Sequence, residues 1–260
     1  KRWIKFKKIS NYIFSKIDIA YPQNRETLNY LKKLKVLKIK IIGNLKFSEN
    51  EKEGLIQINK SFTDQIKNRK IWCASSTHSN EEEICGQIHL NLKKKYPDLL
   101  TIIIPRHTHR SEEVKNDLEK LGLSVVLRSS KIPIKKRTDI YLVDTYGETK
   151  KFYKICNTVF LGGSVTKHGG QNPLEAARLG STIIHGPNID NFKEVYELLG
   201  DTNITLKANN IKKLNKLVYY SLRKDRKNTK FLKIKKIGKK ILTTTTKEIN
   251  SILRDEIKKA

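Results

Sequence analysis

From Ile71 onward, the sequence alternates short apolar runs with longer segments whose apolar residues recur every three or four positions. The run from Leu99 to Ile104 has no polar alternation, which is typical of a strand covered on both faces. The longer segments, such as the one that ends before Pro97, have the spacing of amphipathic helices. Such alternation over roughly 140 residues predicts a doubly wound parallel sheet of the α/β class.

Each predicted strand is followed by a polar or glycine-containing loop. In doubly wound sheets, ligands bind at the carboxyl ends of the strands, so these loops are the candidate site. The predicted strands span Ile71 to Ser75, Leu99 to Ile104, Ser124 to Arg128, Ile140 to Val143, Val159 to Leu161, Thr182 to His185 and Ile204 to Leu206.

The loop after Leu161 is the most distinctive, because it holds four glycines within nine residues. Glycine lets a backbone approach a ligand closely, and a helix is predicted to open at Asn172 with Pro173 in its first turn. The free N–H groups of a helix start favour an anion, and Glu175 is placed to accept hydrogen bonds from sugar hydroxyls. This pattern indicates half of a nucleotide site; the alternative is an ordinary strand–helix turn.

The first 46 residues have a different organisation. A basic, aromatic segment precedes a strand predicted over Ile17 to Tyr21, a helix over Asn24 to Leu34 and a strand over Lys38 to Ile42. Two strands do not make a stable sheet alone, and the sequence contains no methionine, so we expect a chain cut from something longer. The expected domains are 1–47, the incomplete end of an α/β domain; 48–69, a connector; 70–225, a Rossmann-like domain; and 226–260, basic C-terminal helices.

Positive charge is concentrated at the two ends of the chain. The net charge is +28; residues 1–69 hold 17 Lys and Arg against 6 acids, and residues 207–260 hold 18 against 4. This favours contact with an anionic membrane face or a polyanion, although a Lys-rich composition alone would give the same pattern. No apolar run has the length of a membrane span, and the three scattered cysteines match no zinc spacing.

Taken in order, the strand-end motifs resemble those of one family. They are Trp72 to His78 with Glu81 and Glu82, Pro105-Arg106-His107 with Arg110, Asp144 to Glu148, Gly162-Gly163-Ser164, Gly169 to Glu175, and His185-Gly186-Pro187 with Asn191-Phe192; Gly43 to Phe47 resembles the signature before the interdomain connector. The family is the 3-deoxy-D-manno-octulosonic acid (Kdo) transferases of lipopolysaccharide biosynthesis, and the resemblance runs from about residue 10 to residue 200.

The resemblance implies a GT-B glycosyltransferase with two Rossmann-like domains. It implies transfer of Kdo from CMP-Kdo to a lipid A precursor (lipid IVA), with inversion, at the cytoplasmic face of the inner membrane. The catalytic base and the membrane anchor are expected in an N-terminal part, so no residue here is assigned as catalytic. The implied CMP contacts are Pro105, Arg106, Tyr146, Gly147, Glu148, Asn172, Pro173, Leu174 and Glu175.

Three positions depart from the family pattern: Gln171 replaces the usual His, Asn80 the usual Gly and Tyr146 the usual Met. Gln171 can donate a hydrogen bond but cannot carry a proton. His78, His107, His168 and His185 are candidates at the loop rim, whereas His89 is expected to be a packing or surface residue and His109 to be exposed. We expect no metal and no cofactor beyond the donor CMP-Kdo.

Two other functions remain open at this point. One is a GT-B transferase that uses another nucleotide sugar. The other is a basic nucleic-acid-binding protein, which the charge alone favours. Against it, the basic segments form no stacking platform with aromatic residues, and the motifs lie in the near-neutral middle of the chain, so no nucleic-acid partner is expected.

Overall fold

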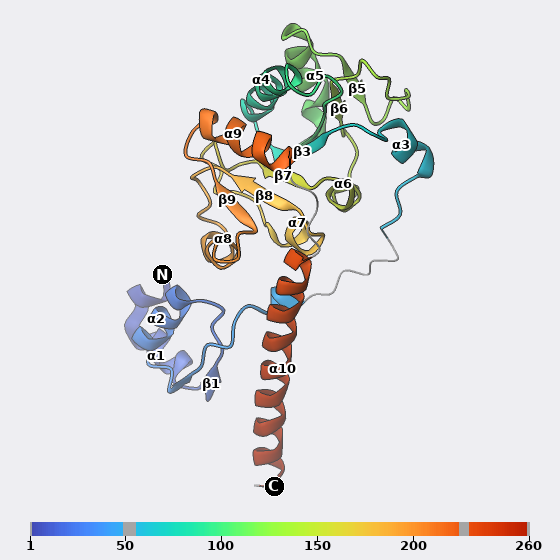
Figure 1. Cartoon of the computed structure of the whole chain (residues 1–260). Helices are drawn as coiled ribbons and strands as arrows, with labels where there is room; N and C mark the ends of the chain where they lie inside the picture. Colours follow the sequence, from blue (N-terminus) through green and yellow to red (C-terminus); the bar gives the residue numbers. More distant parts are fainter. Residues whose placement is uncertain (1, 49–55, 224–228, 259–260) are drawn as a thin grey trace. The chain divides into compact units, whose positions relative to one another are not determined.

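The computed structural model describes residues 2–48, 56–223 and 229–258, and the chain divides into two compact units (Figure 1). Unit 1 contains Lys1–Glu51 and Leu232–Ala260, and unit 2 contains Lys52–Phe231. The C-terminal segment, expected as a separate set of helices, therefore groups with the N-terminal residues.

Unit 2 is built on a seven-stranded sheet in which every pairing is parallel. The strand order is β5-β6-β4-β3-β7-β8-β9, so the chain turns to opposite sides of β3 when it enters β4 and β7. The predicted doubly wound sheet is confirmed. Its strands are β3 (Ile71–Thr77), β4 (Leu100–Pro105), β5 (Val125–Leu127), β6 (Ile140–Leu142), β7 (Thr158–Leu161), β8 (Thr182–His185) and β9 (Thr205–Lys207).

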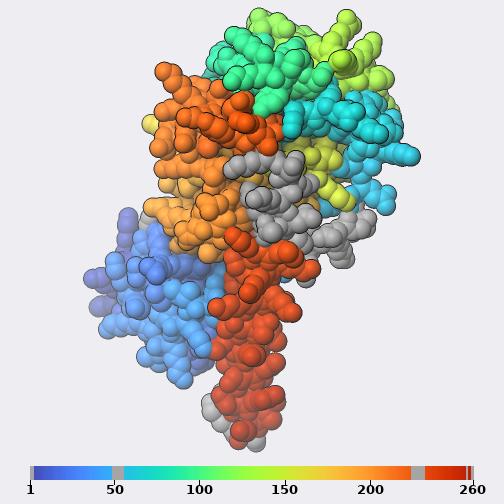
Figure 2. Space-filling view, viewed as in Figure 1, coloured from blue at the N-terminus to red at the C-terminus, as the bar shows by residue number. Residues whose placement is uncertain are grey.

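Helices cover both faces of this sheet (Figure 1). On one face, α4 (Glu81–Lys93), α5 (Ser111–Lys120) and α9 (Ile211–Leu222) enclose a core around the fully buried Trp72. In the space-filling view, α9 in orange lies against α4 in green (Figure 2). The other face carries α6 (Thr149–Ile155), α7 (Leu174–Arg178) and α8 (Lys193–Gly200).

Successive residues of β3 serve the two faces, as the alternation of side chains along a strand requires. Ala74 belongs to the core under α4, whereas the hydroxyl of the next residue, Ser75, lies 2.8 Å from the Tyr153 hydroxyl of α6. Both side chains of this hydrogen bond are buried, so the pair satisfies two polar groups that would otherwise be costly to bury. The central strand is thereby fixed between two helical layers.

One predicted helix begins later in the structure than expected. Helix α7 begins at Leu174, not at Asn172, because the Asn172 side chain accepts a hydrogen bond from the Leu174 N–H (3.1 Å) in a turn before the helix. The described part of the connector, residues 56–69, contains the short helix α3 (Lys60–Gln65). A short 3-10 helix, η4 (Thr108–Arg110), leads into α5.

Unit 1 holds two short parallel strands and a long helix. It consists of η1 (Arg2–Phe6), α1 (Lys7–Phe14), β1 (Ile19–Ala20), α2 (Arg25–Lys33), β2 (Lys38–Ile39), η2 (Leu45–Ser48) and most of α10 (Thr229–Ile257). Helix α10 passes so close to η2 that a Cβ at Gly238 would lie 2.1 Å from the Phe47 carbonyl oxygen. Lys40 and Tyr21 both hydrogen-bond Glu248 of α10. Among the described residues, no helix is long and apolar enough to cross a membrane.

Candidate functional site

The loops after β3, β4 and β7 meet at the carboxyl edge of the sheet, beside the point where the strand order reverses. The His78 ring, after β3, stacks on the His168 ring of the glycine-rich loop, with centroids 4.0 Å apart and an interplanar angle of 17°. The His107 ring, after β4, meets His78 edge-on at 5.9 Å. Loops that the sequence separates by some 30 to 90 residues therefore form one surface.

Glu81, at the start of α4, organises two of these loops. Its side chain is fully buried and accepts five backbone hydrogen bonds. Four come from the loop after β7 and one from the loop after β3: Gly163 N (2.6 Å), Val165 N (3.0 Å), Ser164 N and Thr166 N (3.2 Å each), and His78 N (3.1 Å). Successive N–H groups of this kind form an anion-binding concavity, and here the anion belongs to the protein.

This arrangement corrects the interpretation of the first two glycines. A Cβ at Gly162 would lie 2.5 Å from the Ser76 carbonyl oxygen, and Gly163 adopts φ of +65°. Glycine is therefore required at Gly162 by the approach of β7 to β3. Since the N–H groups of residues 163–166 are directed at Glu81, they are not available to a ligand, and a bound anion has to use other groups at this edge.

Arg106 is one such group. Its backbone N–H donates to the Thr77 carbonyl oxygen (2.9 Å), which extends the β3–β4 pairing by one residue past the buried Pro105. Its side chain is exposed, next to His107. The predicted pair Pro105-Arg106 is thus one buried anchor and one exposed cation at the carboxyl end of a central strand.

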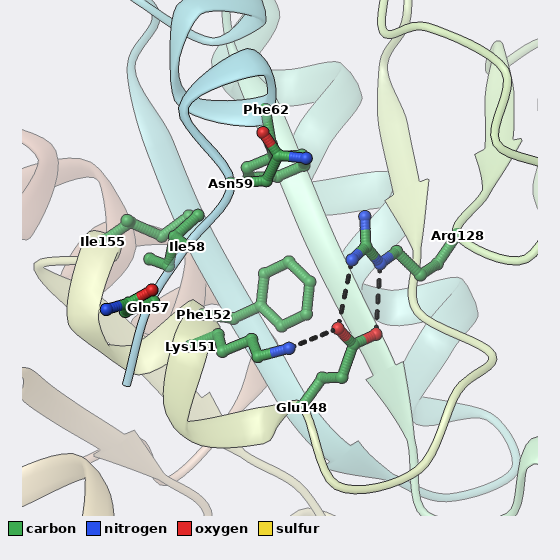
Figure 3. Close-up of a pocket in the computed structure, with 9 residues that line it drawn as sticks. All are labelled: Gln57, Ile58, Asn59, Phe62, Arg128, Glu148, Lys151, Phe152 and Ile155. Carbon is green, nitrogen blue, oxygen red and sulfur yellow. Dashed lines mark hydrogen bonds and ion pairs between the residues drawn. The ribbon is translucent and has the colours of Figure 1, made fainter. Parts of the chain in front are cut away.

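Glu148 lies further along the edge, where β5 and β6 end, and it is paired with Arg128 (Figure 3). Arg128 Nε and Nη2 donate to its two carboxylate oxygens at 3.1 and 3.0 Å, Lys151 Nζ donates at 3.0 Å, and Thr145 Oγ1 donates as well. The hydrogen bonds from Arg128 lower the pKa of Glu148 to about 2. This carboxylate therefore stays ionised, and it is a poor general base.

The Arg128–Glu148 pair lines a cavity of about 170 Å³ that also reaches the connector (Figure 3). The rings of Phe62, in α3, and Phe152, in α6, face this cavity and contact each other edge-on, with centroids 5.9 Å apart. The sequence did not reveal this pocket, because Arg128 and Glu148 are 20 positions apart and no local pattern indicates that they pair. The remaining lining residues are Gln57, Ile58, Asn59, Lys151 and Ile155.

The other predicted contacts lie on the rim with different exposures. Tyr146 is exposed, and Gly147 adopts φ of +78° with open space at its Cα, so the backbone of this turn is accessible. Asn172 is exposed and Glu175 partly so, whereas Pro173 and Leu174 are buried. Glu175 Oε1 lies 3.6 Å from Lys150 Nζ of α6.

Burial and hydrogen bonds show whether the remaining histidines are structural or accessible to a ligand. His89 is buried between Thr101 (2.8 Å) and Asp139 (3.2 Å) and is structural, which agrees with a packing residue. His185 was a rim candidate, but it is buried, with Nδ1 2.7 Å from the Gly186 carbonyl oxygen and its ring packed on Tyr196. His109 is exposed. Within residues 2–48, 56–223 and 229–258, no three His, Cys, Asp or Glu side chains are placed to hold a metal ion.

Comparisons with known proteins agree with the family resemblance of the sequence motifs. The chain is 36% identical over 184 residues to the 3-deoxy-D-manno-octulosonic acid transferase of Haemophilus influenzae, covering 70% of this chain and 42% of that protein. Among solved structures, the C-terminal CMP-Kdo binding domain of WaaA from Acinetobacter baumannii matches with a TM-score of 0.61 and 27% identity, covering 70% of this chain and 94% of that domain. The chain is a relative of the Kdo transferases.

The similarity covers only part of each Kdo transferase: the chain spans less than half the length of the first curated relatives that it matches. No family model matches it. HepE from Anabaena in complex with UDP matches with a TM-score of 0.52 and 10% identity, over 96% of this chain and 68% of HepE, and shares the fold alone. The predicted fold class, Rossmann-like α/β of the GT-B type, is confirmed.

Proposed function

We propose that unit 2 binds the nucleotide of CMP-Kdo, as the donor-binding part of a glycosyltransferase that moves Kdo to a lipid A precursor. One observation carries the proposal: the fold and sequence of unit 2 are similar to a domain named for binding CMP-Kdo, over nearly all of that domain. The predicted contact residues lie along one edge of the sheet, where ligands bind in doubly wound folds.

Each contact has a chemical role in this proposal. Arg106 binds the phosphate or the Kdo carboxylate through charge-assisted hydrogen bonds. Because the Glu148 side chain is engaged by Arg128, the accessible backbone of Tyr146, Gly147 and Glu148 reads the cytosine edge. The turn of Asn172, Pro173 and Leu174 places Glu175 beside the ribose hydroxyls.

The base that activates the acceptor lies outside this chain in the proposed mechanism. Transfer with inversion needs a general base that takes a proton from the acceptor hydroxyl as the bond to CMP breaks. Among the predicted contacts, Glu148 is a poor base for this step, because a carboxylate with a pKa of about 2 has little affinity for that proton. No metal is proposed, because CMP is itself a good leaving group for the sugar.

The lipid acceptor places the reaction at the cytoplasmic face of the inner membrane. The basic residues at both ends of the chain would attract anionic headgroups, and such attraction weakens as salt screens it. Nucleic acid is not proposed as a partner.

Thermal unfolding with added nucleotides tests the donor assignment. A ligand that binds only the folded state raises the midpoint by mass action, so CMP is expected to stabilise the chain more than UDP or GDP at equal concentration. A larger effect of UDP would favour a transferase of another nucleotide sugar. No effect of any of the three nucleotides would contradict the proposal.

A further inference from the structure

Two imidazole rings stand face to face at the centre of the carboxyl edge, and neither is among the contacts that the family resemblance implies. These rings, His78 and His168, are called the histidine pair below. Their centroids lie 4.0 Å apart and their planes are nearly parallel, at 17°. They come from the loops after β3 and β7, the two strands that flank the point where the strand order reverses.

The protein holds both rings in place. His168 Nδ1 lies 2.9 Å from Thr166 Oγ1, and Asn191 Nδ2 donates to the His168 carbonyl oxygen at 3.0 Å. Gln171 Nε2 lies 3.4 Å from His78 Nε2. With the Gln171 amide in this orientation, its nitrogen can only donate, so His78 Nε2 is the acceptor.

The surroundings of His78 favour its neutral form when no ligand is bound. Burial lowers the pKa of His78, and His168, His107 and Arg106 lower it further. The opposing charge comes from Glu81 of α4. That carboxylate is already satisfied by five backbone N–H groups, so its ability to compensate a second positive charge is limited.

A phosphate group that enters beside Arg106 reverses this balance, because it brings the negative charge that the pair lacks. Two stacked imidazolium rings at 4.0 Å repel each other strongly, so the pair can accept one proton but not two. The shared proton would then face the anion and strengthen its binding.

We propose that the histidine pair takes up one proton when a nucleotide phosphate binds, so that donor affinity is linked to pH through His168 and His78. The inference rests on the proposed function, because it assumes that unit 2 binds CMP. It adds a binding role for His168, because its imidazole can take up a proton, whereas the Gln171 amide cannot.

Isothermal titration of the 260-residue chain with CMP tests the linkage. The titrations are run at pH 7.5, where the CMP phosphate is almost entirely a dianion, in buffers of different ionisation enthalpy. The dependence of the observed heat on that enthalpy gives the protons taken up. We expect about half to one proton per CMP, and an affinity that falls up to about tenfold per pH unit as the pH rises past the pKa of the complex.

His168→Phe keeps a stacked ring but cannot take a proton. It is expected to lower the proton uptake at least about twofold and to flatten the pH dependence. His168→Gln is the second variant, and His109→Phe is the matched control at an exposed ring beside His107 (5.6 Å). The control should keep the wild-type proton uptake.

The outcomes separate the two proposals. If the wild type binds CMP without proton uptake, or if both His168 variants keep the wild-type uptake, the proton-linked pair is wrong and the proposed function stands. Absence of CMP binding by the folded wild type would overturn the proposed function and this inference with it.

Discussion

At the scale of single residues, the donor proposal depends most on Arg106. Its guanidinium is exposed at the end of β4, while its backbone continues the pairing with β3. Arg106→Ala should remove a charge-assisted hydrogen bond to the phosphate or carboxylate, worth about 1.5–3 kcal/mol, and weaken CMP binding about 10- to 100-fold. Arg137→Ala, at an exposed arginine before β6 and so at the opposite edge of the sheet, is the matched control. An unchanged dissociation constant for Arg106→Ala would remove Arg106 from the site.

Single residues also show what the sequence could reveal about the site. The positions of Pro105-Arg106 and Gly147 at or after the ends of strands were predictable, because each comes at or after a short apolar run that is typical of a buried strand. The role of Glu81 was not, since a carboxylate in the first turn of a helix is expected to complement the helix dipole. Only the fold brings the N–H groups of residues 163–166, more than 80 positions later, onto that carboxylate.

At the scale of elements, the contact that Glu81 of α4 makes with the loop after β7 is expected to stabilise the fold. Glu81→Gln keeps the size of the side chain but replaces one acceptor oxygen with an amide that points at N–H donors. Leaving Gly163 N and His78 N without an acceptor should lower the free energy of unfolding by about 2–5 kcal/mol. Urea unfolding measures this loss. Glu83→Gln, in the same turn but exposed, should change stability by less than about 0.5 kcal/mol, and equal effects would contradict the role of Glu81.

The ends of β5 and β6 are joined by the Arg128–Glu148 pair, which gives a pH dependence of known sign. The folded-state pKa of Glu148 is lowered to about 2, mainly by Arg128. A lowered pKa adds stability above the unfolded value near 4.3, and this contribution is lost as the pH falls toward 2. Arg128→Met should therefore destabilise the chain most at pH 5 to 7, and the difference from the wild type should shrink between about pH 4 and pH 2.

Unfolding by urea at several pH values measures that difference. Lys136→Met is a suitable control, because the Lys136–Asp98 pair is exposed and its two charged atoms are 3.9 Å apart. A stability difference between wild type and Arg128→Met that stays constant from pH 7 to pH 3 would mean that Glu148 does not depend on Arg128 for its ionisation.

At this scale, the sequence predicted the strands of the sheet but not how the two ends of the chain pack. Short apolar runs indicated all seven strands of the sheet, and the run of β4, which is buried along its whole length, gave the clearest pattern. The association of α10 with residues 1–48 was not predictable. It depends on contacts between Gly238 and Phe47 and between Glu248 and Lys40, which are about 190 to 210 positions apart.

At the scale of the whole molecule, the excess positive charge and the proposed nucleotide contacts lie in different parts of the sequence. The basic residues are concentrated in residues 1–69 and 207–260, whereas the proposed contacts lie between residues 105 and 175. We expect the chain to sediment with vesicles of anionic lipid at low salt and to be released as the Debye length falls from about 10 Å at 0.1 M to about 3 Å at 1 M. Equal binding to vesicles of neutral lipid would contradict an electrostatic contact.

The central claim is that unit 2 recognises a cytidine nucleotide at the carboxyl edge of its sheet. Titration calorimetry of the 260-residue chain with CMP and with UMP tests it most directly, because the two ligands share ribose and phosphate and differ at the base edge. A site that hydrogen-bonds the base rejects an analogue with the wrong donor pattern, so CMP should bind at least about tenfold more tightly than UMP. Equal affinity for the two, or tighter binding of UMP, would contradict the account.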